Sequence, residues 1–442
     1  MSAGGLSATR LARMHDVLAG YVERGELPGL VALVSRRGEV HVEAIGTMAF
    51  GSGQPMRRDT IFRIASLTKP ITAAAAMILV EECILRLDDP VDRWLPELAD
   101  RRVLRRLDAP LDDTVPAHRP ITLRDLLTFR PGFGAVMAPP GQYPIQQAMA
   151  EAGLAPGPDL PAVPPDEWLR RLGRPPLLYQ PGEVWLYHAS ADVLGVLIAR
   201  AAGQPLETFL RARLVAPLGM RDTGFHVPAD KRDRLPHCYV ADPDTGTLAV
   251  YDDPDASRWS RPPVFPAGGG GLVSTADDLL AFFRMMLHKG RCGRERILSR
   301  RAVELMTADH LTPEQQVGPH VLLEEGHSWG FGMAVGTRRH DLAGSPGRFG
   351  WDGGYGTSTM FSKARARSCP SRFGSRGQAL GVRMISAPLS MSSRALSGNS
   401  RSKQIMAPTC TGPAAVSSVQ TGKSSPGVQA ASRLKSQVWT LA

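Results

Sequence analysis

The chain has 442 residues, of which 43% are hydrophobic, and it carries a formal net charge of +10. That length and apolar content suffice for a large buried core in one or two domains. The basic excess is confined to residues 362–442, which hold twelve Lys and Arg side chains and no Asp or Glu. Residues 1–361 carry 40 basic and 42 acidic side chains, a balance that gives no electrostatic case for binding nucleic acid.

Targeting signals and metal-binding patterns are absent from the sequence. The five cysteines are odd in number and widely spaced, so they indicate neither a disulfide framework nor a zinc site. No apolar run reaches the ~18 residues of a membrane-spanning helix, and the N-terminus lacks the charged-then-apolar pattern of a signal segment. We therefore expect a cytoplasmic protein without a membrane span, a metal or another cofactor.

Hydrophobic periodicity and turn signals predict the following elements in chain order. They are a helix over 11–21, a β-hairpin formed by 29–35 and 39–45, an apolar helix that begins near Ser66, short helices and loops over 95–128, a proline-rich irregular region over 131–181, a helix over 185–202, a flexible glycine-rich loop over 267–272, a capped helix over 278–287, and strands over 329–335 and 348–361.

The sequence changes character after Phe361. Ser, Arg, Gly and Pro dominate residues 362–442, and no hydrophobic periodicity continues there. Such a composition cannot bury enough apolar surface to offset the entropy lost on ordering. We predict a basic, low-complexity and disordered tail, and the alternative is an arm that binds nucleic acid or a membrane surface.

Ser66 and Lys69 are the candidate nucleophile and base. Residues three apart share one face of a helix, and the helix behind this pair is apolar. A serine hydroxyl becomes nucleophilic when a neighbour takes its proton, and a buried lysine can do so because burial favours its neutral form. Pro70 requires the helix to begin close to Ser66, where free N–H groups favour a developing negative charge. Ser-x-x-Lys also occurs at 400–403 and 432–435 without an apolar helix, so the motif alone is weak.

Two further segments could take part in acyl transfer. Tyr187 lies at a loop-to-helix junction, where a phenol can exchange a proton if cations are near; a packing role is the alternative. The segment 350–358 is glycine-rich and strand-like, so its N–H groups could bind an oxyanion; a bulge or tight turn is the alternative. The sequence contains no His-Glu-x-x-His, Gly-x-Ser-x-Gly or Walker A motif.

These motifs occur in the order Ser66-x-x-Lys69, Tyr187 after Pro-Gly-x-x-Trp, and Trp351-Asp352-Gly353. In that order, residues 10–361 resemble the serine β-lactamase and penicillin-binding-protein superfamily, in particular class C-type β-lactamase-related hydrolases such as family VIII carboxylesterases. The resemblance implies an α+β fold in which helices flank an antiparallel sheet, beside a mostly helical subdomain at about 85–260.

The resemblance also implies roles for individual residues. Ser66 is the acylated nucleophile, while Lys69 and Tyr187 share general-base and general-acid duty. The N–H groups of Ser66 and of one residue in the strand that contains Trp351-Asp352-Gly353 bind the oxyanion. The candidates in that strand are Trp351, Asp352, Gly353 and Gly354. No metal takes part.

Departures from the family motifs bear on the substrate. The second motif is commonly Tyr-x-Asn, but Ala189 stands at the asparagine position. The third motif of true lactamases is Lys-Thr-Gly, whereas Asp352 in this chain would repel a substrate carboxylate. We therefore expect a serine hydrolase that acts on carboxylic esters through an acyl-enzyme. The alternatives are a β-lactamase, a D-amino-acid peptidase or amide hydrolase, and a catalytically silent binding or regulatory protein.

The end of the chain is a further departure. In this family, additional sheet strands and a C-terminal helix follow the third motif, but residues 362–442 resemble neither. The sequence reads as though a shifted reading frame had replaced them. We therefore expect the C-terminal strands to be missing, an edge of the sheet to be uncovered and the hydrolase domain to be destabilised.

Overall fold

The computed structural model describes residues 4–157, 159–242, 245, 247–316, 322–339, 345–362 and 379–385. Its helices are α1 (Ala8–Glu23), η1 (Ala65–Leu67), α2 (Thr68–Glu81), η2 (Pro96–Leu98), α3 (Leu123–Leu127), α4 (Pro144–Glu151), α5 (Pro165–Leu172), α6 (Ala189–Ala202), α7 (Leu206–Leu210), η3 (Arg211–Val215), η4 (Ala229–Arg234), η5 (Arg258–Ser260), α8 (Ala276–Leu287), α9 (Arg300–Met306) and η6 (Pro313–Gln316). Its strands are β1 (Gly29–Arg36), β2 (Glu39–Gly46), β3 (Phe62–Arg63), β4 (Arg102–Leu104), β5 (Thr114–Pro116), β6 (Cys238–Ala241), β7 (Leu248–Asp252), β8 (Val273–Ser274), β9 (Arg291–Cys292), β10 (Glu295–Arg296), β11 (His327–Trp329), β12 (Ala334–Gly336), β13 (Phe349–Gly353), β14 (Thr357–Ser362) and β15 (Ala379–Ile385).

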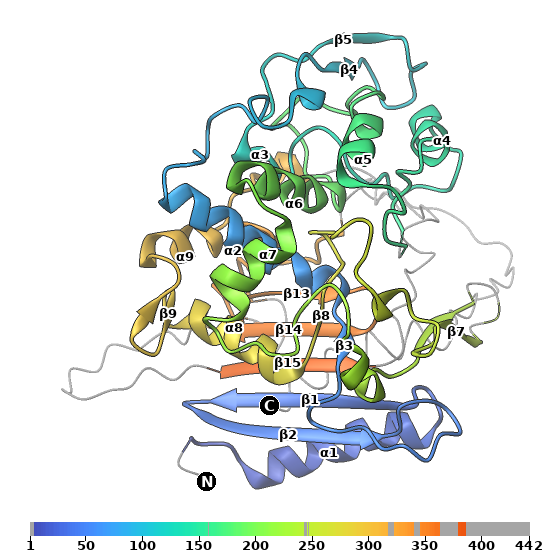
Figure 1. The fold of residues 1–442 in the computed structure, drawn as a ribbon, viewed down its shortest axis with the longest axis vertical. Helices are drawn as coiled ribbons and strands as arrows, with labels where there is room; N and C mark the ends of the chain where they lie inside the picture. The colour runs from blue at the N-terminus through green and yellow to red at the C-terminus, as the bar shows by residue number, and fades with distance from the viewer. Residues whose placement is uncertain are drawn as a thin grey trace, which may run out of the picture.

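A seven-stranded antiparallel sheet organises the molecule, with the strand order β11-β12-β13-β14-β15-β1-β2. Helix α1 packs beside β2 at one end of the sheet, and α8 packs on β15 and β1. The helices α3 to α6 gather at the other end of the molecule, near β4 and β5 (Figure 1). This arrangement confirms the predicted α+β fold class, while the subdomain limits at about 85 and 260 stay predictions.

Strand β15 corrects the expectation that the C-terminal strands are missing. It pairs with β14 from Ser362↔Ala379 to Ser358↔Arg383, and its other edge pairs with β1 over the whole strand. The average composition of residues 362–442 does not reveal this strand, because a segment forms a strand mainly when neighbouring strands can pair with it. The prediction of disorder is therefore wrong for these seven residues; residues 363–378 and 386–442 lie outside the described part of the chain.

Helices α2 and α6 form the centre of the fold and pack against each other. Helix α2 is buried from Thr68 to Leu79, so it has no solvent-facing side and is a core helix rather than an amphipathic surface helix. Helix α6 begins at Ala189 and not at Trp185 as predicted, because His188 has a φ of 91°, outside the helical region. Residues 185–187 before it lie outside any helix or strand, and Leu186 N–H donates a hydrogen bond of 2.7 Å to the Phe129 carbonyl.

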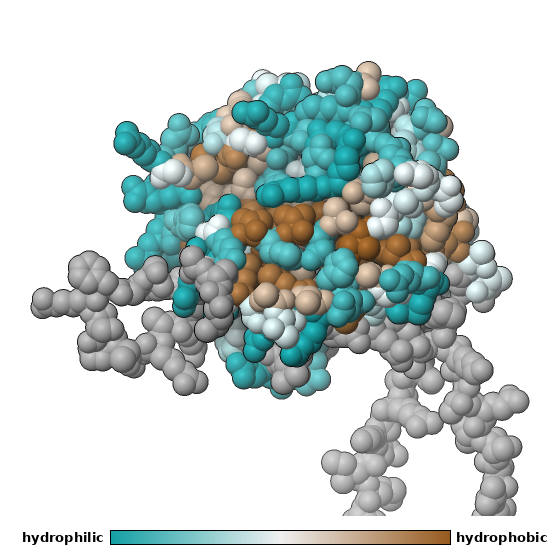
Figure 2. All heavy atoms as spheres, turned by 90° about the horizontal axis from the view of Figure 1, so that it is seen from below, coloured by the Kyte–Doolittle hydropathy of each residue, from teal (hydrophilic) through white to brown (hydrophobic). Residues whose placement is uncertain are grey.

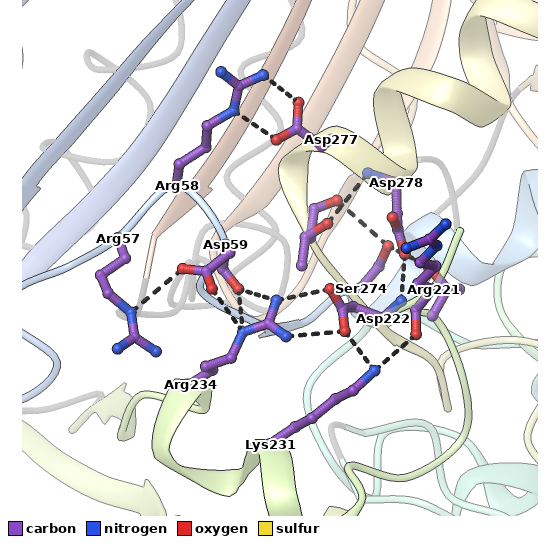
Figure 3. Close-up of polar contacts among 12 residues, drawn as sticks. Arg57, Arg58, Asp59, Arg221, Asp222, Lys231, Arg234, Ser274, Asp277 and Asp278 are labelled. Atoms are coloured by element: carbon purple, nitrogen blue, oxygen red, sulfur yellow. Dashed lines mark hydrogen bonds and ion pairs between the residues drawn. The ribbon is translucent and has the colours of Figure 1, made fainter. Parts of the chain in front are cut away.

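Ion pairs connect distant segments on one side of the molecule. In Figure 3, Lys231 and Arg234 point toward Asp222, at 2.8 Å and 2.7 Å, and Arg58 forms a two-bond pair with Asp277 of α8. These residues come from the loop before β3, from η4 and the loop that precedes it, and from the start of α8. The network therefore fixes the loops around β3, the strand that leads into Ser66.

The surface seen from below Figure 1 is mostly hydrophilic, with apolar side chains gathered in patches (Figure 2). Among the described helices, none is long and apolar enough by itself to cross a membrane. Two helical segments, Ala189–Ala202 and Leu206–Val215, reach the length and hydropathy of a membrane span when taken together, but they are bent by 81° relative to each other.

Candidate active site

Ser66 and Lys69 lie where η1 meets α2, as the sequence predicts. The Lys69 side chain is fully buried. Its Nζ donates a hydrogen bond of 2.8 Å to Ser66 Oγ and another of 2.6 Å to the Gly269 carbonyl. Ser66 itself is only partly buried, so its hydroxyl lies at the edge of the core. The preceding Ala65 has a φ of 45°, a left-handed conformation that is strained for a residue with a Cβ and is typical of functional sites.

Tyr187 lies beside the same lysine. Lys69 Nζ is 4.8 Å from the centroid of its ring, and Trp351 Nε1–H donates to the tyrosine hydroxyl at 2.7 Å. The ring belongs to a buried aromatic cluster with Phe129, Trp185 and Trp329. The structure thus brings Ser66, Lys69, Tyr187 and Trp351 together from three distant parts of the chain.

Strand β13 approaches the Ser66 turn closely because Gly353 has no side chain. A Cβ at Gly353 would lie 2.4 Å from the Ile64 carbonyl oxygen and 2.1 Å from Thr357 Oγ1. Thr357 Oγ1 in turn donates to the Ile64 carbonyl at 3.0 Å, which fastens the sheet to the turn. Any larger residue at position 353 would push β13 away from the candidate nucleophile.

The residues predicted to bind the oxyanion do not all face the candidate nucleophile. Within the described part of the chain, the backbone N–H groups of Ser66 and Gly354 donate no hydrogen bond, and a Cβ at Gly354 would meet nothing within 4 Å. Trp351 faces Tyr187, and side chains alternate along a strand, so Asp352 lies on the opposite face of β13. There it accepts a bond of 2.6 Å from Ser358 Oγ. This geometry gives no support to the argument that Asp352 repels a substrate carboxylate.

Asp192 and His188 lie near Lys69 in the candidate site, although the motifs did not point to them. Asp192 is buried in the first turn of α6 and accepts a bond of 2.8 Å from the Gly269 N–H. Burial raises its pKa to about 6, although Lys69 and the Gly269 N–H act in the opposite direction. Burial, together with the nearby Lys69, lowers the pKa of His188 to about 3, so its imidazole is neutral. An acid in the first turn of an apolar helix was the available signal for Asp192.

The glycine-rich loop is held in place, contrary to the expectation of a flexible segment. Thr72 Oγ1 of α2 donates to the Gly268 carbonyl at 2.7 Å, and Asp192 of α6 holds Gly269. A Cβ at Gly268 would lie 2.5 Å from the Ala191 carbonyl oxygen, so the loop packs directly on the backbone of α6. The glycines here allow close packing rather than mobility.

The model of the family described as Beta-lactamase matches residues 14–382 of the chain. The chain belongs to this family. It is 40% identical over 346 residues to Protein Rv1367c of Mycobacterium tuberculosis, covering 76% of this chain and 82% of that protein. It is 33% identical over 382 residues to esterase EstB of Burkholderia gladioli, covering 81% of this chain and 88% of that protein.

Solved structures of the same fold include a hydrolase and a synthase. EstCE1, described as a hydrolase with promiscuous acyltransferase activity, has a TM-score of 0.68 and 26% identity, covering 88% of this chain and 96% of that one. The LovD6 mutant of simvastatin synthase from Aspergillus terreus has a TM-score of 0.67 and 25% identity, covering 88% and 94%. The predicted class is confirmed: this β-lactamase family member is a serine hydrolase of the esterase-like type.

Proposed function

We propose that the protein is a carboxylesterase that works through an acyl-enzyme on Ser66. The observation that carries this proposal is the bond of 2.8 Å from Lys69 Nζ to Ser66 Oγ, beside a tyrosine held by Trp351. A hydroxyl bonded to a buried amine, which itself lies beside a fixed phenol, has the partners that nucleophilic catalysis requires.

Catalysis proceeds by two acyl transfers. Ser66 Oγ attacks the ester carbonyl and loses its proton to the Lys69–Tyr187 pair. The N–H groups of Ser66 and Gly354 bind the negative oxygen of the tetrahedral intermediate. The intermediate collapses, and the leaving alkoxide departs as an alcohol with the proton returned by the same pair. Water then attacks the acyl-serine, gives up a proton to the pair, and releases the carboxylic acid and free Ser66.

We infer a preference for short-chain acyl esters over β-lactams. The side chain at the start of the third motif is Trp351, and its Nε1–H is already bonded to Tyr187. It offers no cation to a substrate carboxylate, in contrast to the lysine of Lys-Thr-Gly. Ala189, at the asparagine position of the second motif, offers no side-chain amide to an acyl-amide substrate. Neutral esters need neither group.

Active-site labelling and turnover test the proposal. A fluorophosphonate should label Ser66 alone, and Ser66→Ala should abolish both labelling and hydrolysis of p-nitrophenyl butyrate. Ser35→Ala, at a buried serine of β1 on another part of the sheet, is the matched control and should keep both. Labelling that persists in Ser66→Ala would exclude this nucleophile. Much faster turnover of nitrocefin than of the butyrate ester would overturn the substrate preference.

Acyl transfer to an alcohol is a second candidate activity. The observation that favours it is a relative, the monacolin J acid methylbutanoyltransferase of Aspergillus terreus, 30% identical over 294 residues. An acyl-enzyme on Ser66 would then be attacked by an alcohol in place of water. Formation of a new ester when a small alcohol is added to the butyrate assay would support this activity. Unchanged butyric acid yield across alcohol concentrations would exclude it.

A further inference from the structure

Side chains from two separate apolar clusters lie next to the turn that carries Ser66. One cluster contains Tyr187 and the aromatic rings around it. The other, here called the Tyr355 cluster, contains Ala65, which directly precedes Ser66, together with Trp259 and Tyr355. Tyr355 lies in the turn between β13 and β14, so the sheet contributes to both clusters.

The proposed reaction assigns these two clusters to different parts of an ester. In the tetrahedral intermediate, the negative oxygen lies at the N–H groups of Ser66 and Gly354, and the leaving oxygen must be within reach of the Lys69–Tyr187 pair that protonates it. The acyl chain is the one substituent of the carbonyl carbon that remains. It therefore extends away from Tyr187 and toward the Tyr355 cluster, since Tyr355 directly follows Gly354.

The loop between α4 and α5, residues 152–164, reaches the Tyr355 cluster from another part of the molecule. Helices α4 and α5 lie in the upper part of Figure 1, above β7, and Leu160 of the loop packs against both the Tyr355 cluster and the large core cluster around α2 and α6. Four of the thirteen loop residues are proline, which fixes φ and limits the conformations that a loop can adopt. Leu160 is only partly buried, so the loop holds an apolar side chain at the boundary of the cluster.

Asp159, the residue before Leu160, fastens the loop to the elements around the cluster. Its Oδ1 accepts a hydrogen bond of 2.8 Å from the Tyr251 hydroxyl of β7 and another of 2.8 Å from Arg258 Nη1 of η5. Tyr251 is also hydrogen-bonded to Tyr355, and their ring centroids are 5.6 Å apart. A continuous set of contacts thus joins the loop to Tyr355.

We propose that Leu160 and Asp159 determine the length of the acyl chain that the site accepts: Leu160 limits the space beside the Tyr355 cluster, and Asp159 fixes the loop that carries it. The inference rests on the proposed function and extends it, because it names the residues that restrict the substrate to short acyl chains. The Asp159 and Arg258 side chains are 69% and 42% exposed, so their ion pair adds little to the free energy of unfolding. Its loss should therefore change specificity rather than melting.

Three variants test the two residues, and two matched controls accompany them. Leu160→Ala enlarges the space, Leu160→Phe reduces it, and Asp159→Ala releases the loop. Val163→Ala is the control for Leu160, because Val163 is a partly buried residue of the same loop that packs against the large core cluster and, among the described clusters, not against the Tyr355 cluster. Asp166→Ala is the control for Asp159, because Asp166 is an exposed acid of α5 that accepts a bond of 2.8 Å from Arg200.

The readout is a pair of ratios of kcat/KM, measured with thermal melting as the check of folding. The acyl ratio compares p-nitrophenyl octanoate with p-nitrophenyl butyrate, and the alcohol ratio compares benzyl butyrate with ethyl butyrate. We expect Leu160→Ala to raise the acyl ratio about tenfold and Leu160→Phe to lower it. Asp159→Ala should raise it about threefold, the size of an exposed ion pair. Both controls should keep the acyl ratio of the wild type, and all five variants should keep its alcohol ratio.

The contrary outcomes are distinct from one another. An unchanged acyl ratio in both Leu160 variants would refute the role of Leu160, and a rise in Leu160→Ala without one in Asp159→Ala would refute the role of Asp159. A change in the alcohol ratio with a constant acyl ratio would show that the loop borders the alcohol, which overturns the assignment of the Tyr355 cluster to the acyl chain. Folded wild-type protein that hydrolyses none of these esters would refute the proposed function itself.

Discussion

Two buried cations flank Ser66 at equal distances along the chain, and their surroundings differ. Arg63, three residues before Ser66, contacts Asp252 directly: its Nε donates 2.6 Å to Asp252 Oδ2, and its Nη1 donates 2.7 Å to the Pro236 carbonyl. Ser257 Oγ donates to the same carboxylate at 2.6 Å. Lys69, three residues after Ser66, contacts a carbonyl and a hydroxyl, and Asp192 reaches it only through Gly269.

The difference separates a structural ion pair from the candidate reactive site. A guanidinium stays charged and its planar fork suits a carboxylate, so the Arg63–Asp252 pair is a fixed, fully bonded unit. An ammonium can lose its proton, and one that does not touch its anion can exchange partners during a reaction. The contrast predicts that changes near Arg63 affect folding, whereas changes near Lys69 affect activity.

Replacement of Lys69 should have the largest effect. In Lys69→Met, Ser66 loses its polar neighbour while the buried charge is replaced by an apolar chain of similar length. We expect kcat/KM for p-nitrophenyl butyrate to fall by about 10³-fold or more, with a smaller loss of unfolding free energy than in Arg63→Met because Lys69 makes no direct contact with a carboxylate. Lys289→Met, at a surface lysine, should change neither quantity. Activity within tenfold of wild type would show that Lys69 is not part of the machinery.

Replacement of Arg63 should reverse this pattern. Arg63→Met leaves the buried carboxylate of Asp252 without its cation, which should lower the free energy of unfolding by about 3–5 kcal/mol in urea denaturation. The exposed pair Arg58–Asp277 in Figure 3 is the control, and Arg58→Met should cost less than about 1 kcal/mol. The molecules that remain folded should still be labelled at Ser66. Equal costs for the two variants would contradict the comparison.

Ionised Asp192 should lower the free energy of unfolding at neutral and alkaline pH. Burial raises its pKa to about 6 from 3.8, so the folded state binds this proton more tightly than the unfolded state does, and wild-type stability falls as pH rises through that interval. Asp192→Asn has no such titration. It should be more stable than wild type at pH 8 by up to about 3 kcal/mol, and the gain should disappear near pH 4. A stability difference that is independent of pH would contradict this account.

Two tryptophans, Trp351 near Lys69 and Trp259 near Arg63, allow the same comparison through substitutions with smaller expected effects. Trp351 Nε1–H donates to Tyr187 at 2.7 Å, whereas Trp259 Nε1–H donates to the Gly271 carbonyl at 3.0 Å and its ring lies under Arg63. Loss of one such bond is worth about 1–2 kcal/mol. Trp351→Phe should therefore lower kcat/KM about tenfold with little change in melting, and Trp259→Phe should lower the melting temperature with little change in kcat/KM. An identical effect of both variants would remove the distinction.

The sequence by itself determined the elements whose signals are local. Ser66 and Lys69 share a helix face because they are three residues apart, and Pro70 placed the start of α2 within a few residues. The hairpin β1–β2 and the start of α8 behind its Thr275 cap followed from turn and capping residues in the same way. Each of these features depends on contacts within a few residues of the chain.

The tertiary structure decided everything that depends on distant contacts. The strand β15 exists because β14 and β1 pair with its two edges, and a tail-wide composition could not show this. Asp192 meets the loop at Gly269, 77 residues further along the chain, and Lys69 meets the same residue across 200. No spacing rule covers such separations, since they are fixed by the packing of α2 and α6 against the sheet and the loop. The sequence therefore identified the candidate pair, and the fold supplied the groups that surround it.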